Sequence, residues 1–212
     1  MSALHCRSPD VYVRQVFPTW SLPMTDTGVP PSVLGAILAG GRARRFGSDK
    51  AEASLHGQTL LSHVVAALEP QTACVVICGR EWAQGIALPD RPDRDMGPLG
   101  GLNAALHYAQ HNGFDAVVTA GCDTPLLPTN LVAQLCALSS AAIVADIPII
   151  GYWPVALANR LDAHLAAGGN RSVMRWADVV GARRIALDSV IPNINTPDDL
   201  DRVIRSRDAG QS

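Results

Sequence analysis

From Val33 onward, apolar and polar positions follow a regular alternation of strand-like and helix-like blocks. Short apolar runs rich in β-branched residues end in polar or glycine-rich turns, and a segment with helical spacing follows each turn. Strands are predicted at about Val33–Leu38, Cys74–Cys78 and Ala116–Ala120, and helices at about Thr59–Leu68, Leu99–Asn112 and Asn130–Leu138.

This order of elements predicts an α/β fold, a single doubly wound and mostly parallel sheet with helices on both faces. In Rossmann-like sheets of this kind, ligands bind at the carboxyl ends of the strands. Three loops are therefore expected at one edge: the glycine-rich loop after the first strand, the loop before Gly97, and the loop that contains Asp123.

The composition is that of one globular domain. The chain has 212 residues, 48% hydrophobic and 17% charged, and a net charge of −2, which disfavours a nucleic-acid binder with a broad basic face. We expect a domain over residues 33–207 and a poorly ordered extension over residues 1–32, within which Met24 is an alternative start by hypothesis. No apolar run is long enough to cross a membrane.

The five cysteines have neither zinc-ribbon nor CxxC spacing. Cys74 and Cys78 are expected on one face of a strand, as reduced core residues. With no signal peptide in the sequence, reduced thiols favour a cytoplasmic location.

The segment LAGGRARRFGSDK, from Leu38 to Lys50, places three glycines and four cations directly after the first strand. Its glycines allow backbone amides to approach an oxygen-rich ligand, and its cations suit phosphates. It matches neither GxxxxGK[ST] nor GxGxxG. Taken alone, such a loop is a structural turn or a generic anion site about as often as a specific site for a phosphate chain.

The segment GCDTPLLP places Asp123 at the carboxyl end of a predicted buried strand. Beside bound phosphates this carboxylate would need a divalent cation such as Mg²⁺, which commonly binds one or two carboxylates together with substrate phosphates. The alternative is that Asp123 caps the following turn through the amides of Thr124 or Leu126.

The segment DRPDRDMGPLGGL brings a turn at Gly97 and a close helix start at Gly100 and Gly101. Asp90 or Asp93 would accept hydrogen bonds from a base or ribose here, unless the segment is simply a solvated loop.

Together, LAGGRARRFGSDK, GPLGGL, GCDTP and the late NINTPDDL resemble the molybdenum cofactor guanylyltransferase family, over about Val33 to Val203. The resemblance implies a nucleotidyltransferase that transfers GMP from Mg·GTP to the terminal phosphate of molybdopterin or Mo-molybdopterin and releases pyrophosphate. It also implies molybdoenzyme chaperones as partners, and neither nucleic acid nor membrane.

The resemblance further assigns roles to individual residues. The backbone of Leu38, Ala39, Gly40 and Gly41 would hold the nucleotide, Asp90 would lie in the guanosine pocket, and Asp123 would bind Mg²⁺. The catalytic residues would be Arg45, Lys50 and Asp123. The candidates for binding the acceptor are Arg171, Asn193 and Asn195. The LAGG sequence favours GTP over CTP, because cytidylyl relatives typically have alanine at the first of its two glycines.

Two departures from the family keep other functions open. Phe46 replaces the usual methionine, and Ile147 stands where a histidine often precedes the strand of the acceptor half. The alternatives are a nucleotidyltransferase that uses CTP or acts on a sugar or polyol phosphate, and a non-catalytic nucleotide-binding or carrier protein.

Local signals predict details of the helices. Thr196 is expected as an N-cap with Asp199 in the first turn, and Ser172 as the cap of a helix near Trp176. The i, i+4 spacing of His107 and His111 is that of a metal pair, but the polar face of a surface helix is the favoured interpretation.

Overall fold

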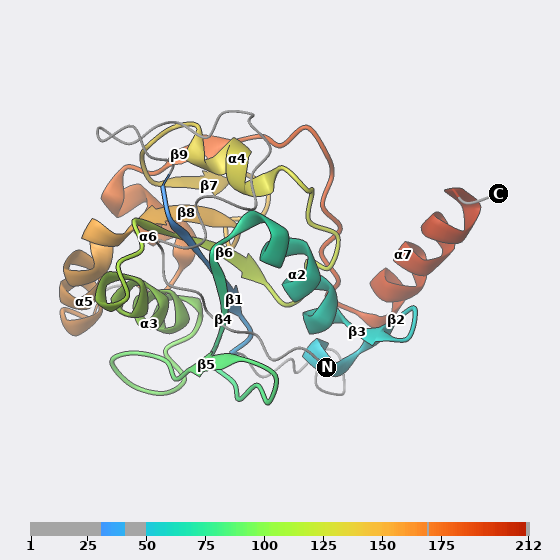
Figure 1. Ribbon diagram of the computed structural model, residues 1–212, viewed down its shortest axis with the longest axis horizontal. Coiled ribbons are helices and arrows are strands. Elements are labelled where there is room, and N and C mark those ends of the chain that lie inside the picture. Colours follow the sequence, from blue (N-terminus) through green and yellow to red (C-terminus); the bar gives the residue numbers. More distant parts are fainter. Residues whose placement is uncertain (1–30, 41–49, 169, 211–212) are drawn as a thin grey trace.

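The chain folds around one seven-stranded sheet with helices packed on both faces, as the alternating pattern predicts (Figure 1). The computed structural model describes residues 31–40, 50–168 and 170–210. The strand order is β5–β4–β1–β6–β8–β7–β9, and β8 alone runs antiparallel to its neighbours in this sheet. The strands are β1 (Val33–Leu38), β4 (Cys74–Cys78), β5 (Ile86–Leu88), β6 (Ala116–Gly121), β7 (Ala142–Val144), β8 (Gly151–Pro154) and β9 (Arg183–Ile185).

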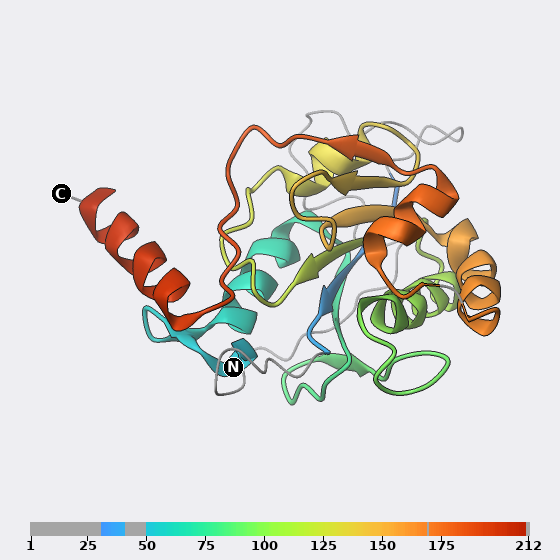
Figure 2. The same ribbon diagram turned by 180° about the vertical axis from the view of Figure 1, so that it is seen from behind.

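Two layers of helices cover the sheet, as the views from opposite sides show (Figures 1 and 2). One layer contains α2 (Leu60–Leu68) and α4 (Leu131–Cys136), and the other contains α3 (Pro98–His111), α5 (Ala158–Ala166) and α6 (Val173–Val180). Alternate residues of each strand face the two layers, so that strands buried on both sides are apolar throughout. In β4, Cys74 and Cys78 face the layer of α3, as expected, while Val75 faces the layer of α2.

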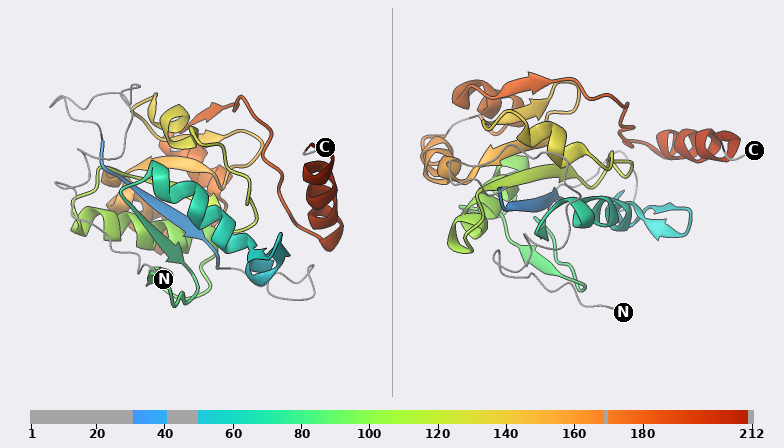
Figure 3. Two further views of the ribbon diagram at one scale, coloured as in Figure 1. Left: turned by 45° about the vertical axis from the view of Figure 1, so that its right-hand side comes forward. Right: turned by 45° about the horizontal axis from the view of Figure 1, so that its top comes forward.

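A small hairpin and the last helix form a side structure next to the main sheet (Figure 3). Strands β2 (Ser54–Leu55) and β3 (Gln58–Thr59) pair antiparallel, and α7 (Pro197–Gly210) extends outward beside them. Leu55, Leu60, Ile194 and Val203 form the buried contact between these parts. The chain between β9 and α7 is thereby fixed against the main domain.

Three short 3-10 turns complete the described elements, at Lys50–Glu52, Glu69–Gln71 and Val155–Leu157. The predicted elements are confirmed, with boundaries that differ by one or two residues. Thr59 caps α2 by accepting a hydrogen bond from the backbone N–H of Ser62. Ser172 occupies the N-cap position of α6, but its side chain makes no capping bond.

Helix α3 is joined to α5 by a polar contact that involves one of the two predicted surface histidines. Asp162 Oδ2 lies 2.7 Å from His107 Nε2, and Asp162 Oδ1 accepts a hydrogen bond from the buried Asn103 at 2.7 Å. His111 is exposed at the end of the same helix. His107 therefore ties two helices together instead of lying on a purely solvated face.

The cysteines of the described residues, Cys74, Cys78, Cys122 and Cys136, are free thiols, and Cys6 lies outside this part of the chain. The expected extension over residues 1–32 likewise lies almost entirely outside it. No helix within the described ranges combines the length and the apolar character needed to span a bilayer.

Candidate active site

The candidate site lies where the carboxyl ends of three parallel strands meet. Leu38, the last residue of β1, is paired with Cys78 at the end of β4 and with Gly121 at the end of β6. From β1 the chain proceeds to β4 on one side and later returns to β6 on the other. This reversal is the switch point at which open α/β sheets bind ligands.

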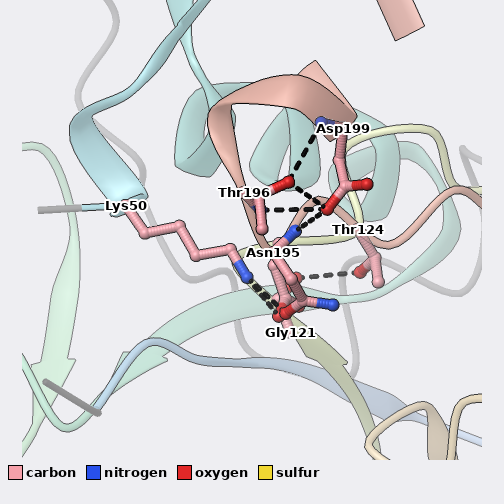
Figure 4. Close-up of polar contacts among 7 residues, drawn as sticks. Lys50, Gly121, Thr124, Asn195, Thr196 and Asp199 are labelled. Atoms are coloured by element: carbon pink, nitrogen blue, oxygen red, sulfur yellow. Dashed lines mark hydrogen bonds and ion pairs between the residues drawn. The ribbon is translucent and has the colours of Figure 1, made fainter. Parts of the chain in front are cut away.

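Lys50, Asp123 and Asn195 come together at this edge from three distant segments (Figure 4). Lys50 Nζ lies 3.0 Å from Asp123 Oδ2 and donates a hydrogen bond of 2.9 Å to Asn195 Oδ1. The Lys50 and Asp123 side chains are 11% and 22% exposed. The ion pair is thus partly shielded from water, which strengthens its interaction with any charged ligand.

The backbone around Asp123 fixes this arrangement. The Asp123 carbonyl accepts a hydrogen bond of 2.9 Å from the Ile194 N–H, which joins the end of β6 to the segment before α7. A Cβ atom at Gly121 would collide with Asp123 Oδ1, so glycine at this position leaves room for the carboxylate in its present orientation. Thr124 donates from both its N–H and its hydroxyl to the Gly121 carbonyl and closes the turn.

The second carboxylate oxygen of Asp123 supports a role in metal binding. Asp123 Oδ1 is buried and has no hydrogen-bond partner, and neither Thr124 nor Leu126 donates its amide to it. The capping alternative is therefore wrong. A buried, unpaired carboxylate oxygen is costly unless a ligand satisfies it, and a divalent cation is a suitable ligand. No cluster of three or more His, Cys, Asp or Glu occurs in the described ranges, so phosphate oxygens would complete such a site.

A cavity of about 1190 Å³ opens at the loops that follow β1, β4 and β5. Gly40 and Gly79 form part of its wall, and Asp90, two residues after β5, lies beside Gly79. The backbone segments at Gly40 and Gly79 touch, since a Cβ atom built on Gly79 would lie 2.5 Å from the Gly40 Cα. The cavity therefore begins directly at the glycine segment, where a nucleoside attached to bound phosphates would be expected.

Asp90 is held close to the backbone of the loop that begins α3. Its carboxylate accepts a backbone hydrogen bond from Met96, and side chains at Gly100 would run into it. Burial raises the pKa of Asp90, the hydrogen bond from Met96 lowers it, and the charge of Asp95 raises it further. Asp93 is exposed and lies outside the cavity wall, so Asp90 alone of the two occupies the predicted position.

The structure describes some of the other predicted residues and not the rest. Leu38 is the last residue of β1, and Ala39 follows it and donates its N–H to the Cys78 carbonyl at 3.0 Å. Gly41 and Arg45 lie outside the described residues.

Two of the three acceptor candidates make no polar contact with Lys50 among the described residues. Arg171 and Asn193 are exposed, and within the described part of the chain no hydrogen bond or ion pair connects them to Lys50. The third, Asn195, contacts Lys50 directly.

Sequence reasoning missed Gly79, Arg80 and the contact between Lys50 and Asn195. Arg80 follows the end of β4 and lies in the cavity wall. The sequence CGR after a buried strand carried the signal, because a glycine and a cation follow β4 as they follow β1. The Lys50–Asn195 contact has no local signal.

Comparison with known proteins identifies the family to which the chain belongs. A family model described as MobA-like NTP transferase domain matches residues 35–183. The molybdenum cofactor guanylyltransferase of Rhizobium leguminosarum bv. trifolii is 38% identical over 197 residues, covering 84% of this chain and 94% of the relative. The protein of the same name from Cereibacter sphaeroides is 40% identical over 183 residues, covering 80% and 94%.

Among solved structures, the molybdopterin-guanine dinucleotide biosynthesis protein A of Archaeoglobus fulgidus has a similar fold. It has a TM-score of 0.68 and 23% identity, and the match covers 83% of this chain and 99% of that one. At this level of identity the likeness supports the arrangement of the strands and helices.

Proposed function

Because the chain belongs to the MobA-like NTP transferase family, and is thus a nucleotidyltransferase, we propose that it transfers GMP from Mg·GTP to the terminal phosphate of molybdopterin or its molybdenum-loaded form. The observation that carries this proposal is the meeting of Lys50 with Asp123 beside the glycine segment of β1. The names of the guanylyltransferase relatives support the choice of GTP and molybdopterin.

The reaction needs no nucleophile from the protein. A terminal phosphate oxygen of the acceptor forms a new bond to the α-phosphorus of GTP, and the bond from that phosphorus to the bridging oxygen of the β-phosphate breaks. Pyrophosphate leaves with the electron pair of the broken bond. The barrier arises from bringing two anions together and from charge that builds on the leaving group, so fixed positive charge lowers it.

Lys50 would supply part of that charge, because its ammonium lies beside Asp123 at the edge of the sheet where the carboxyl ends of β1 and β6 meet. Asn195 and Asp123 both contact the ammonium, at 2.9 and 3.0 Å, which limits its motion before the substrate arrives. A point charge fixed in advance costs little reorganisation when the transition state forms. The backbone of Leu38 to Gly40, together with Gly41, would bring amides to the phosphates.

Asp123 fits a magnesium site through its unpaired Oδ1. When bound, Mg²⁺ would neutralise phosphate charge. Asp90 would accept hydrogen bonds from the guanine or ribose, since its carboxylate lines the cavity next to Gly79. Arg45 would act beside the α-phosphate, and Arg171 and Asn193 remain proposed contacts of the acceptor.

Two further parts of the proposal concern the cell. Free thiols at the described cysteines favour a cytoplasmic location, because disulfides are rare in that compartment. Chaperones of molybdoenzymes are proposed as partners that would receive the product, as the family resemblance implies.

The test is pyrophosphate release by the purified protein with Mg²⁺ and molybdopterin, measured separately with GTP, CTP, ATP and UTP. Release that requires both GTP and molybdopterin is the expected result. A preference for CTP would contradict the guanylyl assignment. Silence with all four nucleotides by a protein that still binds GTP would exclude molybdopterin as the acceptor.

Variants connect this activity with the site. Lys50→Ala and Asp123→Ala should fold normally and lose about 100-fold or more in turnover, the usual cost of removing one preorganised electrostatic group. Asp201→Ala, which changes an exposed aspartate on α7, is the matched control and should keep full turnover. Near-normal turnover in either site variant would remove that residue from the proposed mechanism.

A further inference from the structure

Arg80 is a cation of the cavity wall to which the guanylyltransferase resemblance assigns no role. It directly follows Gly79 in the chain. Because the backbone of Gly79 touches Gly40, Arg80 is one residue from a direct contact with the glycine-rich segment after β1. Its side chain is 20% exposed and lines the same cavity as Asp90. An arginine-bearing loop therefore borders the space in which the nucleotide would lie.

The described ion-pair partner of Arg80, Glu52, belongs to the same 3-10 turn as Lys50. Arg80 Nη2 is 3.0 Å from Glu52 Oε1, and Glu52 is two residues after Lys50 in the same 3-10 turn. The Glu52 side chain is 57% exposed, whereas that of Arg80 is mostly covered. A pair with one well-solvated partner is weak, because water competes for the carboxylate and salt screens the charge.

A triphosphate is a stronger partner for this guanidinium than Glu52. Its oxygens carry several negative charges, and arginine can donate to two of them at once. The fork of Arg80 is already held at the cavity by Glu52, so little side-chain freedom remains to be lost on binding. Glu52 would then return to water at small cost, since most of its side chain is already exposed.

We propose that Arg80 binds the phosphate chain of the nucleotide and that Glu52 holds its guanidinium in position until the nucleotide displaces it. This inference rests on the proposed function for the identity of the nucleotide and adds a residue that selects triphosphates over monophosphates. Gly79 is part of this arrangement, because a side chain there would push its loop, and Arg80 with it, away from Gly40, where the phosphates are proposed to bind.

Calorimetric binding of GTP and GMP with Mg²⁺ to the full chain tests the proposal in four proteins: wild type, Arg80→Gln, Glu52→Gln and the double variant. Arg80→Gln should weaken GTP binding about tenfold or more, as expected for a charge-assisted hydrogen bond, and leave GMP binding within about twofold. Glu52→Gln should strengthen GTP binding severalfold, but only where Arg80 is present. Arg80→Lys should recover part of the GTP affinity.

Two results would overturn the proposal. If Arg80→Gln weakens GTP and GMP equally, the residue shapes the nucleoside pocket or the fold. If Arg80→Gln leaves GTP affinity unchanged, the residue does not bind the phosphate chain. Thermal unfolding of each variant identifies any loss of folding.

The same titrations separate this inference from the proposed function. CTP, ATP and UTP are titrated as well, each with its monophosphate. If one of them binds more tightly than GTP, the guanylyl assignment fails, and the role of Arg80 is decided by the corresponding pair. If the wild type binds no nucleotide, both proposals fail. GTP binding without molybdopterin-dependent turnover would refute the proposed function and leave the result for Arg80 intact.

Discussion

Asp199 Oδ2 accepts a hydrogen bond of 3.0 Å from the backbone N–H of Asn195, the residue whose side chain accepts a hydrogen bond from Lys50 Nζ. The same oxygen accepts hydrogen bonds from the N–H and the hydroxyl of Thr196, and the Asp199 N–H donates back to Thr196 Oγ1 (Figure 4). This reciprocal capping box begins α7. The first turn of the last helix therefore positions a contact of the candidate active site.

Replacing Asp199 should consequently affect both the helix and the activity. Asp199→Ala removes the acceptor that holds Asn195, so Lys50 loses a fixed partner and kcat/KM should fall severalfold. Loss of the capping bonds should also lower the free energy of unfolding. Steady-state kinetics and urea unfolding measure the two effects separately.

Asp198→Ala is the matched control, because Asp198 is an exposed acid in the same turn of α7. It should lower stability only slightly, through the helix dipole, and leave kcat/KM unchanged. Equal activity in the two variants would show that the capping box has no influence on Lys50.

Gly79 and Gly57 both have positive φ angles, +83° and +80°, but only Gly79 is crowded. A Cβ atom at Gly79 would lie 2.5 Å from the Gly40 Cα, and one at Gly57 would meet nothing within 4 Å. Gly57→Ala should thus cost about 1–2 kcal/mol in stability, from the left-handed backbone alone, and leave activity unchanged. Gly79→Ala should cost more and weaken GTP binding, because it pushes the two loops apart.

Urea unfolding and GTP titration of these two variants decide between strain and crowding. If Gly79→Ala matches Gly57→Ala in both measurements, the contact with Gly40 has no energetic importance. If Gly79→Ala is less stable but binds GTP normally, the contact serves the fold and not the nucleotide.

Much of the fold could be predicted because the central strands are buried on both faces. In β1 and β4 every residue is buried, so each appears in the sequence as a continuous apolar run with clear ends. In β5 and β9 no residue is fully buried, and with three residues each they carry no usable periodicity. The antiparallel direction of β8 is decided by pairing with β6 and β7, which a local pattern does not encode.

Some contacts of the candidate site could likewise be predicted from the sequence, and others could not. The meeting of the glycine segment with Asp123 could be predicted, because parallel strands present their carboxyl ends at one edge. The contact of Lys50 with Asn195 spans 145 residues and depends on the packing of Ile194 against the hairpin. Only the folded chain reveals such a contact, since neither residue has a neighbour in sequence that signals it.

Thr119 connects two strands through its hydroxyl in the buried sheet. It donates to the Ile149 carbonyl at 2.7 Å and accepts a hydrogen bond of 3.1 Å from Trp153 Nε1. Thr119→Val keeps the shape but leaves both groups buried without that partner, which should lower the unfolding free energy by about 2–3 kcal/mol. Thr119→Ser, which keeps the hydroxyl, should cost clearly less in the same urea titration. Unchanged stability of Thr119→Val would show that the two hydrogen bonds of the hydroxyl contribute nothing to the free energy of unfolding.

The contact of Asp162 with Asn103 and His107 should make stability depend on pH. Burial alone would raise the pKa of Asp162, but the hydrogen bond from Asn103 and the charge and hydrogen bond of His107 lower it below its ordinary value. A carboxyl group whose pKa is lower in the folded protein stabilises the fold above its unfolded pKa of about 3.9. This stabilisation is lost as the pH falls through the folded pKa.

Asp162→Asn should therefore be less stable than the wild type at pH 6, and the difference should shrink progressively as the pH falls below about 4. Urea midpoints at a series of pH values measure it. Asp178→Asn is the control, because Asp178 pairs with Arg184 at the surface, with side chains 44% and 53% exposed. Its effect should stay below about 1 kcal/mol at every pH. A difference for Asp162→Asn that stays constant from pH 6 to pH 3 would show that the contact between α3 and α5 acts through packing and not through the charge of the carboxylate.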